Sequence, residues 1–308
     1  MRVLIALGGN AMTAPDGSAR PDDQIAAVTG AMEHVADLVV AGHEVALTHG
    51  NGPQVGNILV KNELAADVVP PVPLDWCGAQ TQGTIGFILL DALQRAFWLR
   101  GVERPVAALV TRTRVDADDP LLVRPSKPVG RYLPYAEART LIEHGQNWED
   151  RGERGWRRVV ASPEPREVLD ADPARVLLDQ GYVVVVGGGG GIPVVHESGG
   201  LRGIEAVIDK DLTAALLARA LGVDALVIAT DVDHVQTGYG TAYARALTQV
   251  TSAQLRSYAA AGEFAAGSMG PKVEAVCRFV EHGGRRAVIT SLAHIEDAVT
   301  GAAGTVVS

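Results

Sequence analysis

The chain has little cysteine and no recognisable metal-binding motif. Its only two cysteines, Cys77 and Cys277, form neither a CxxC pair nor a Cys/His zinc spacing, and the eight histidines show no ligand spacing either. We therefore expect two reduced thiols in a cytoplasmic protein, and no metal held by protein side chains alone.

Long apolar runs are also missing. The longest one, residues 84–99, is interrupted by Asp91, Gln94 and Arg95, so it is too polar to span a bilayer. The apolar run at residues 3–7 is too short for a signal peptide and ends in glycines. We read it as a buried first strand and expect no membrane partner.

The chain has no excess of positive charge. Its formal net charge is −9 and its pI is about 5.4, which argues against nucleic acid as a partner. A small anionic substrate remains possible, because local lysines and loop dipoles set the field in a cleft. With 308 residues and 47% hydrophobic residues, the chain is long and apolar enough for one compact α/β body with two lobes.

Two common nucleotide motifs are absent, and three glycine-rich loops stand in their place. No Gly-Lys-Ser/Thr follows the five-glycine run at 187–191, and Ile192 occupies the last glycine position of a GxGxxG pattern. Apolar stretches run directly into this loop and into the loops at 8–10 and 49–53. Glycine lets backbone N–H groups approach an anion closely. A single loop of this kind is as often a simple turn, but three in one chain indicate that more than one anionic group is bound. Together with the lysines at 210 and 272 they predict phosphoryl transfer.

Strand and helix patterns alternate along most of the chain. This alternation predicts a mainly parallel sheet covered by helices on both faces, with ligands at the carboxyl ends of the strands. The expected strands are 3–7, 44–48, 106–111, 182–186, 225–230, 286–290 and 305–308. The expected helices lie between Asp22 and Gly42, after Pro53, and at 78–100, 134–144, 173–180, 211–221, 271–282 and 295–300. Prolines and mixed charges at 112–175 predict an inserted lid.

Three lysines are candidates for neutralising phosphate. Lys210 lies between two aspartates and Lys272 follows Gly270-Pro271, each at an expected helix start, where positive charge opposes the helix dipole. Lys127 lies at the base of the expected lid. A lone lysine is more often a solvated surface charge, and Asp211 could be only a helix N-cap.

Several segments resemble the carbamate kinases of the amino-acid-kinase superfamily, in that family's order. These segments are 6–11, 48–57, 73–75 with 81–83, 126–130, 155–160, 188–194, 205–211 and 267–275. The resemblance implies a homodimeric three-layer αβα sandwich with a mainly parallel sheet. It also implies an acceptor lobe at 1–180, a nucleotide lobe at 181–308, and a role in arginine metabolism. The implied reaction uses Mg²⁺-bound ATP or ADP together with carbamate or carbamoyl phosphate.

The same resemblance assigns roles to individual residues. The loops would bind the acceptor and the phosphoryl group through Gly8, Gly9, Asn10, Gly50, Asn51, Gly52, Gly188, Gly189 and Gly190. Lys127, Lys210 and Lys272 would neutralise phosphates, with Asp209 orienting lysines. Nucleotide contacts would come from Asp231, Tyr239, Ser268, Met269 and Lys272, and Mg²⁺ would be bound through the nucleotide phosphates.

One feature of this chain bears on the choice of substrate. Residues 4–7 contain no lysine, unlike superfamily members that phosphorylate amino-acid carboxylates or nucleotides, and Lys127 is the natural substitute. Two other features depart from the family pattern. The segment 240–243 lacks the proline and lysine of some members, which concerns the adenine pocket, and the glycine run is one residue longer than expected. Carbamate is already an anion, so its oxygen needs no general base. The alternatives are another superfamily kinase and a non-catalytic nucleotide-binding regulator.

Overall fold

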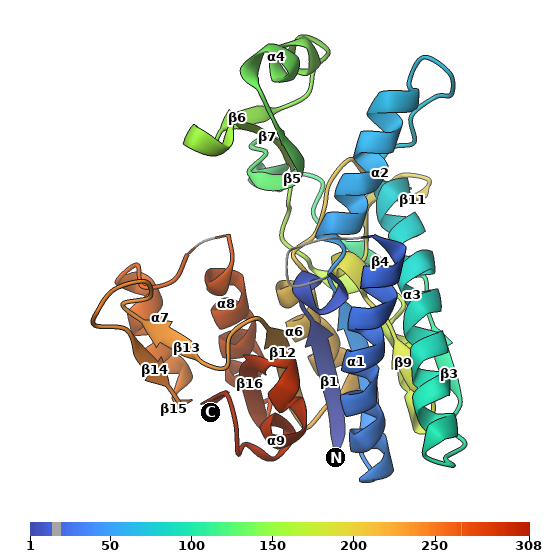
Figure 1. The fold of residues 1–308 in the computed structure, drawn as a ribbon, viewed down its shortest axis with the longest axis vertical. Helices are drawn as coiled ribbons and strands as arrows, with labels where there is room; N and C mark the ends of the chain where they lie inside the picture. Colours follow the sequence, from blue (N-terminus) through green and yellow to red (C-terminus); the bar gives the residue numbers. More distant parts are fainter. Residues whose placement is uncertain (14–19, 266) are drawn as a thin grey trace.

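The computed structural model describes residues 1–13, 20–265 and 267–308, and its centre is an eight-stranded sheet (Figure 1). From β16 to β3 every neighbouring pair of strands is parallel, while β17 runs antiparallel to β16 at one edge. In spatial order the strands are β15 (Gln249–Val250), β17 (Thr305–Val307), β16 (Arg286–Ser291), β12 (Ala225–Thr230), β1 (Arg2–Leu7), β2 (Glu44–His49), β9 (Val183–Val185) and β3 (Val106–Ala108).

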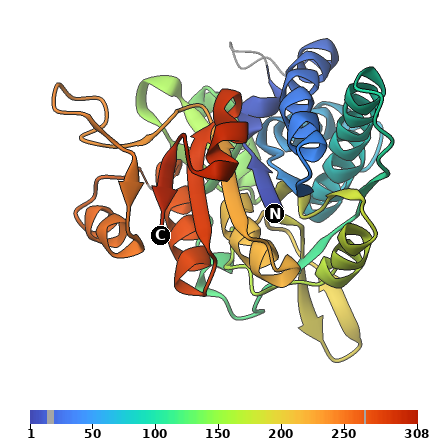
Figure 2. The same ribbon diagram turned by 90° about the horizontal axis from the view of Figure 1, so that it is seen from below.

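Helices cover both faces of this sheet, which confirms the three-layer αβα architecture (Figure 2). Strand β1 is buried on both sides because its alternate residues enter different cores. Val3, Ile5 and Leu7 pack with one helical layer, and Leu4 and Ala6 pack with the other. The first layer contains α1 (Pro21–Val40), α3 (Leu74–Leu99) and α9 (Ile295–Thr300); the second contains α5 (Ala171–Asp179), α6 (Lys210–Leu221), α7 (Ser252–Ala260) and α8 (Met269–Glu281).

The residue types at their ends explain where these helices begin and end. Helix α1 begins with Pro21 followed by Asp22 and Asp23, where a fixed φ and negative charge suit the first turn. Helix α6 ends at Gly222, whose φ of 63° terminates the helix in the left-handed region.

A small subdomain projects beyond the carboxyl ends of the central strands (Figure 1). It contains the antiparallel strands β5 (Lys127–Leu133), β7 (Trp156–Val160) and β6 (Trp148–Asp150), with helix α4 (Tyr135–Glu143). Its own core is small and includes Leu133, Ala138 and Trp148.

The expected lid at 112–175 is too broad, because both of its ends belong to the main body. Strand β4 (Arg112–Arg114) joins a four-stranded sheet with β8 (Glu167–Val168), β10 (Ile192–Glu197) and β11 (Gly200–Gly203), and α5 packs against the central sheet. The expected lobe boundary near residue 180 falls within the central sheet, where β9 lies between β2 and β3.

Smaller elements complete the described part of the chain. They are helix α2 (Gly52–Ala65), the hairpin of β13 (Val235–Thr237) with β14 (Arg245–Leu247), and five 3-10 turns at Gly9–Met12, Pro120–Leu122, Gly152–Arg154, Gly188–Gly190 and Leu292–His294. The expected strand 106–111 stops at Ala108, and the helices expected at 78 and 271 begin earlier, at Leu74 and Met269. Across the described ranges, no helix is both long and apolar enough to cross a membrane.

Candidate active site

The three glycine-rich loops meet in one hollow of about 300 Å³ at the carboxyl ends of the central strands. We call it the phosphoryl hollow. The residues predicted from the sequence that line it are Gly9, Gly50, Asn51, Gly52, Lys127, Gly189, Asp209, Lys210, Ser268 and Lys272. Gly8 does not line it, and its N–H donates to Ala229 O at 3.0 Å. The side chain of Asn10 lies outside the described residues.

Asp211 holds two of the lysines together. Its carboxylate forms an ion pair with Lys210 and a second one with Lys272, in which Nζ and Oδ2 are 3.2 Å apart. Asp211 is only 3% exposed. Burial alone would raise the pKa of Asp211, but the two ammonium groups outweigh burial and hold it below its usual value. Asp211 is therefore ionised and fixes both cations in place.

Asp209 anchors the third lysine and caps helix α6. Its Oδ2 lies 2.6 Å from Nζ of Lys127, while Oδ1 accepts from the backbone N–H of Asp211 at 2.9 Å and of Leu212 at 3.3 Å. The N-cap of α6 is thus Asp209, and the reading of Asp211 as a simple cap is wrong. The predicted contact of Asp209 with a lysine is present.

Two further helix starts leave backbone donors free of side-chain caps. The N-cap of α2 is Asn51, whose side chain donates to Thr81 Oγ1 at 2.9 Å and caps nothing. The N-cap of α8 is Ser268, which also makes no side-chain cap bond. Both residues line the phosphoryl hollow, so both helix N-termini can receive an anion there.

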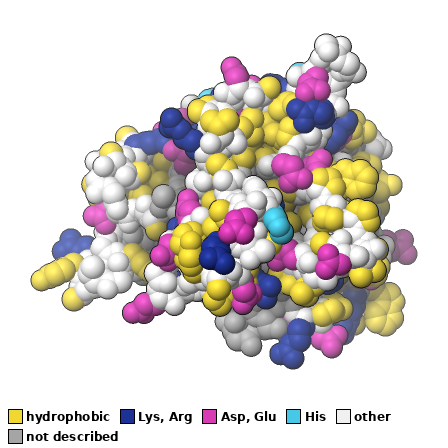
Figure 3. Space-filling model, turned by 90° about the horizontal axis from the view of Figure 1, so that it is seen from above, with side chains coloured by type: hydrophobic (Ala, Val, Ile, Leu, Met, Phe, Trp, Pro, Cys, Tyr) yellow, Lys and Arg dark blue, Asp and Glu magenta, His cyan; other side chains and the backbone are white. Residues whose placement is uncertain are grey.

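The positive charge of this hollow is local. The chain contains only four lysines, and three of them line the phosphoryl hollow. On the face that carries the projecting subdomain, Figure 3 shows Lys and Arg side chains interspersed with Asp and Glu. The hollow can therefore attract a small polyanion although the whole protein is acidic.

The glycine run is required by close packing. Gly189 has a φ of +66°, and a Cβ placed on it would lie 2.1 Å from Asn51 Nδ2. Gly190 has a φ of +90°, and a Cβ there would lie 2.6 Å from the carbonyl oxygen of Ile208. Any other residue would be strained and would collide. Gly188 and Gly190 shape the loop, but only Gly189 of this run lines the phosphoryl hollow.

His49 lies within the second loop and is neutral at pH 7. It is 1% exposed, and burial lowers its pKa to about 4. Its Nδ1 lies 2.8 Å from Gly50 O, so the neutral ring donates its Nδ1–H to that carbonyl. A Cβ on Gly188 would lie 2.4 Å from His49 Nε2, so the ring packs directly against the third loop.

A second hollow, of about 390 Å³, adjoins the first. Its walls include the four other residues that the sequence assigned to nucleotide binding, Asp231, Tyr239, Ser268 and Met269. Ser268 lines both hollows, so an elongated ligand could occupy the two together. Tyr239 is 72% exposed and forms an outer wall.

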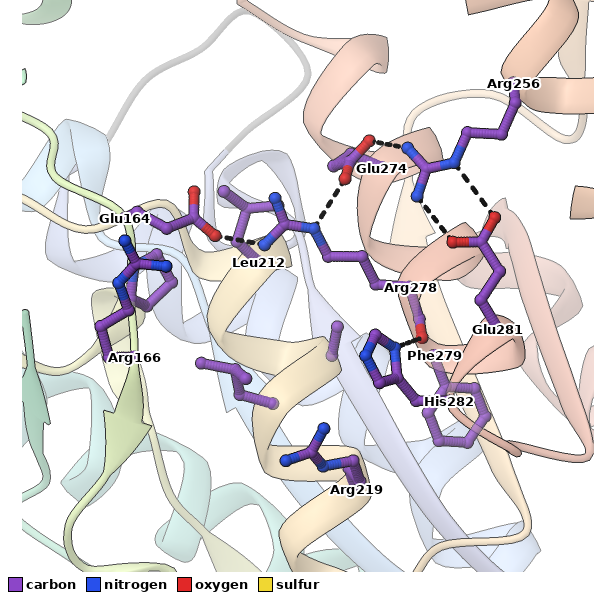
Figure 4. A pocket seen from close by; sticks show the side chains of 13 residues that line it. Glu164, Arg166, Leu212, Arg219, Arg256, Glu274, Arg278, Phe279, Glu281 and His282 are labelled. Carbon is purple, nitrogen blue, oxygen red and sulfur yellow. Dashed lines mark hydrogen bonds and ion pairs between the residues drawn. The ribbon is translucent and has the colours of Figure 1, made fainter.

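A separate hollow of about 490 Å³ lies against α6, α7 and α8 and is also rich in arginine (Figure 4). Its guanidinium groups are largely engaged by acids. Arg278 pairs with Glu164 and Glu274, and Arg256 pairs with Glu274 and Glu281. We therefore regard this network as structural: it ties α7, α8 and the segment that returns from the projecting subdomain.

Comparisons with known proteins agree with this geometry. The model of the amino acid kinase family matches residues 1–291. The chain belongs to the amino acid kinase family.

Its relatives narrow the family further. It is 44% identical to a carbamate kinase of Thermococcus kodakarensis, over 99% of this chain and 98% of that protein. It is 41% identical to a carbamate kinase-like protein of Escherichia coli, with the same coverage. Among solved structures, the carbamate kinase of Giardia lamblia bound to AMP-PNP superposes with a TM-score of 0.93 at 39% identity, covering 99% of this chain and 98% of that one.

Two residues of this site, Asp211 and Gln82, were not predicted from the sequence. Sequence reasoning did not assign Asp211 as the partner of two lysines, although the pattern Asp209-Lys210-Asp211 was visible. It gave no role to Gln82, which bonds to the third loop. The scarcity of lysine was an unused signal, because a chain with so few lysines would be expected to place them for function.

Proposed function

We propose that the protein transfers a phosphoryl group reversibly between ATP and carbamate, giving ADP and carbamoyl phosphate. The observation that carries this proposal is the meeting of Lys127, Lys210 and Lys272 with loop amides and two uncapped helix starts in one hollow. Several relatives of about 40% identity are named carbamate kinases, which supports carbamate as the acceptor.

In the proposed reaction an oxygen of carbamate attacks the γ-phosphorus of ATP. A new O–P bond forms, the bond to the β-phosphate oxygen breaks, and ADP leaves with the released negative charge. The attacking oxygen is already anionic, so no side chain has to remove a proton. The protein contributes alignment and neutralisation of the charge that spreads over the transferred oxygens. Lysine ammonium groups and loop amides, held in place by Asp209 and Asp211, suit this task.

The acceptor and the transferred group would bind at the first two loops through Gly9, Asn10, Gly50, Asn51 and Gly52. Gly8, Gly188 and Gly190 would act indirectly by shaping the backbone, and Gly189 would contact the phosphates. The nucleotide would extend past Ser268 into the second hollow, with its base near Tyr239 and Met269 and its ribose toward Asp231. Carbamate would then lie on the side formed by the N-terminal half of the chain, and the nucleotide on the other.

Mg²⁺ would enter on the nucleotide phosphates. Asp209 and Asp211 are both paired with lysines, and the described residues contain no group of three or more His, Cys, Asp or Glu side chains able to hold a metal. The ion would supply charge neutralisation between the phosphates. The protein side chains fit this arrangement because they leave the phosphate oxygens to coordinate the metal.

The projecting subdomain would act as a lid. Lys127 is the first residue of β5, so the subdomain delivers one cation to the phosphoryl hollow through its ion pair with Asp209. Carbamate decomposes readily in water, and a lid that excludes water would protect it.

We also infer a cytoplasmic homodimer. Trp76, Phe87 and Trp98 recur on α3 at intervals of 11 residues, which places them on one helix face, and they are 61%, 63% and 78% exposed. Aromatic side chains gathered on one exposed face are typical of protein interfaces. Cys77 and Cys277 are buried free thiols, which is compatible with a reducing compartment.

A substrate panel tests the proposed reaction. The protein would be supplied with Mg²⁺ and ATP, and ADP release would be measured with carbamate, N-acetylglutamate, aspartate and a nucleoside monophosphate in turn. Of the four acceptors, we expect only carbamate to cause ADP release. ADP release with a different acceptor would show that this acceptor is the substrate, and no ADP release with any of them would favour a nucleotide-binding regulator. The panel is needed because the Escherichia coli relative is named only carbamate kinase-like.

A further inference from the structure

Side chains surround the third glycine loop and hold its carbonyl oxygens. Thr48 Oγ1 donates to Gly187 O at 2.9 Å, and Gln82 Nε2 donates to Gly188 O at 2.9 Å. Thr113 and Thr213 donate to Gly190 O at 2.8 and 3.0 Å. These side chains belong to β2, α3, β4 and α6 and are at most 5% exposed.

The same loop leaves two backbone donors unused. Gly190 N–H donates to Gly187 O and Gly191 N–H donates to Gly188 O, both at 3.0 Å. In the described part of the chain, the N–H groups of Gly188 and Gly189 donate to no protein acceptor. Gly189 also lines the phosphoryl hollow. A buried N–H group normally has a partner, so the N–H of Gly189, the residue that lines the hollow, is available to a ligand.

Planarity of the peptide bond connects the two observations. The carbonyl of one residue and the N–H of the next lie in one rigid plane and point in opposite directions. Fixing Gly187 O through Thr48 therefore fixes the N–H of Gly188. Fixing Gly188 O through Gln82 fixes the N–H of Gly189 in the same way. The two donors that remain unused are the ones whose peptide planes these two side chains hold.

Gln82 is itself rigidly held. Its Oε1 accepts from Thr111 N–H at 2.8 Å, and its Nε2 also donates to Thr111 O at 3.1 Å. Thr111 Oγ1 in turn accepts from Gly187 N–H at 3.0 Å. The amide of Gln82 therefore spans from the chain segment after β3 to the glycine loop, and its NH₂ group has a defined direction.

We propose that Thr48 and Gln82 are positioning residues for phosphoryl transfer. They hold the successive peptide planes 187–188 and 188–189, and so fix the direction in which the N–H group of Gly189 meets the transferred phosphoryl group. Neither side chain touches the substrate, since both act through the loop backbone. The inference rests on the proposed phosphoryl transfer and adds residues that no glycine or lysine pattern identifies.

The chain offers a matched control for loss of a buried hydroxyl. Thr305 is 0% exposed, like Thr48, and its Oγ1 accepts from Val235 N–H at 2.8 Å and donates to Leu247 O. It lies on β17, away from the glycine loops. Thr305→Val and Thr48→Val remove the same group from equally buried sites, so a purely structural role predicts the same outcome for both.

The experiment compares Thr48→Val, Thr48→Ser, Gln82→Met and Thr305→Val with the unchanged protein. Thermal melting first establishes that each variant is folded. ATP formation from carbamoyl phosphate and ADP then gives kcat and the KM for ADP. We expect kcat to fall about ten- to a hundredfold in Thr48→Val and Gln82→Met, with the KM for ADP within about twofold, because the amides act on the transferring group. Thr48→Ser, which keeps the hydroxyl, and Thr305→Val should retain kcat.

A second readout separates this inference from the choice of substrate. Aluminium fluoride mimics a phosphoryl group in transit and should tighten the binding of ADP with Mg²⁺, as measured by calorimetry. Thr48→Val and Gln82→Met should lose this tightening. If the unchanged protein fails with carbamoyl phosphate but shows the fluoride effect, the proposed substrate is wrong and the positioning role is still tested. Equal kcat and equal fluoride tightening in Thr48→Val and Thr305→Val would overturn the inference. Each variant reports on its own peptide plane, so one folded variant is enough to decide.

Discussion

Nζ of Lys127 lies 2.6 Å from Oδ2 of Asp209, which joins the first strand of the projecting subdomain to the first turn of α6. The Lys127 side chain is 33% exposed and that of Asp209 is 12% exposed, so a ligand can reach the ammonium group. The pair therefore couples the position of the subdomain to the charge in the phosphoryl hollow.

This relationship predicts that Lys127→Met lowers turnover about a hundredfold, because one cation that stabilises the transferred group is lost. The melting temperature should change little, since a partly exposed ion pair contributes little stability. Lys61→Met is the control, because Lys61 is exposed on α2 and does not line either hollow. Steady-state kinetics of both variants decide the point, and equal turnover would remove Lys127 from the mechanism.

Asp211→Asn should affect stability as well as turnover. Lys210 and Lys272 would be left close together without their shared counter-ion in a buried site. Breaking a buried ion pair in this way costs roughly 3 kcal/mol of unfolding free energy. Urea denaturation at pH 7 would measure it, with Asp172→Asn as the control for an exposed pair with Arg175. A loss no larger than that of Asp172→Asn would contradict the role of Asp211 as an anchor.

His49 predicts a specific pH dependence of stability. Burial lowers its pKa to about 4 in the folded protein, against 6.5 for the ordinary side chain. Between these values unfolding takes up a proton, so acidification favours the unfolded state. The unfolding free energy of the unchanged protein should fall by up to about 3 kcal/mol relative to His49→Gln as the pH drops from 6.5 to 4. Parallel stability curves for the two proteins would show that His49 titrates normally.

The aromatic face of α3 predicts the oligomeric state. Light scattering after gel filtration should give about twice the 32.2 kDa chain mass for the unchanged protein. Phe87→Glu places a charge in the middle of that face and should give monomers. Val176→Glu, at a 58% exposed position on α5, should remain dimeric. A dimeric Phe87→Glu would place the interface elsewhere.

Local patterns in the sequence predicted most of the central fold. Apolar strands and amphipathic helices alternate over much of 1–108 and 171–308, and most strands of the central sheet and the helices beside them begin within a few residues of the expected positions. Helix α7 and the short strands β10, β11, β13, β14 and β15 were not expected. The four-stranded sheet could not be predicted in the same way. Strand β4 pairs with β10, about 80 residues further along the chain, and both strands are short. Such pairing depends on tertiary contacts, so residues 112–126 and 161–175 resembled an insertion although they belong to the body.

In the candidate site, too, local features were predictable from the sequence and long-range contacts were not. Glycine loops and lysines beside helix starts are local features, and ten of the site residues predicted from the sequence line one hollow in the structure. The partners that hold them are distant in the chain. Asp211 meets Lys272 across 61 residues, and Gln82 meets Gly188 across 106. Because these contacts exist only in the folded protein, no spacing rule could have identified them.

The most direct test of the central claim is the formation of ATP from carbamoyl phosphate, ADP and Mg²⁺ by the purified protein, measured side by side with Lys272→Ala and Lys61→Ala. Phosphoryl transfer in the lysine-lined hollow predicts rapid ATP formation by the unchanged protein and by Lys61→Ala. It also predicts a loss of about a hundredfold or more in folded Lys272→Ala. No ATP formation by the unchanged protein, or equal rates in all three proteins, would contradict it.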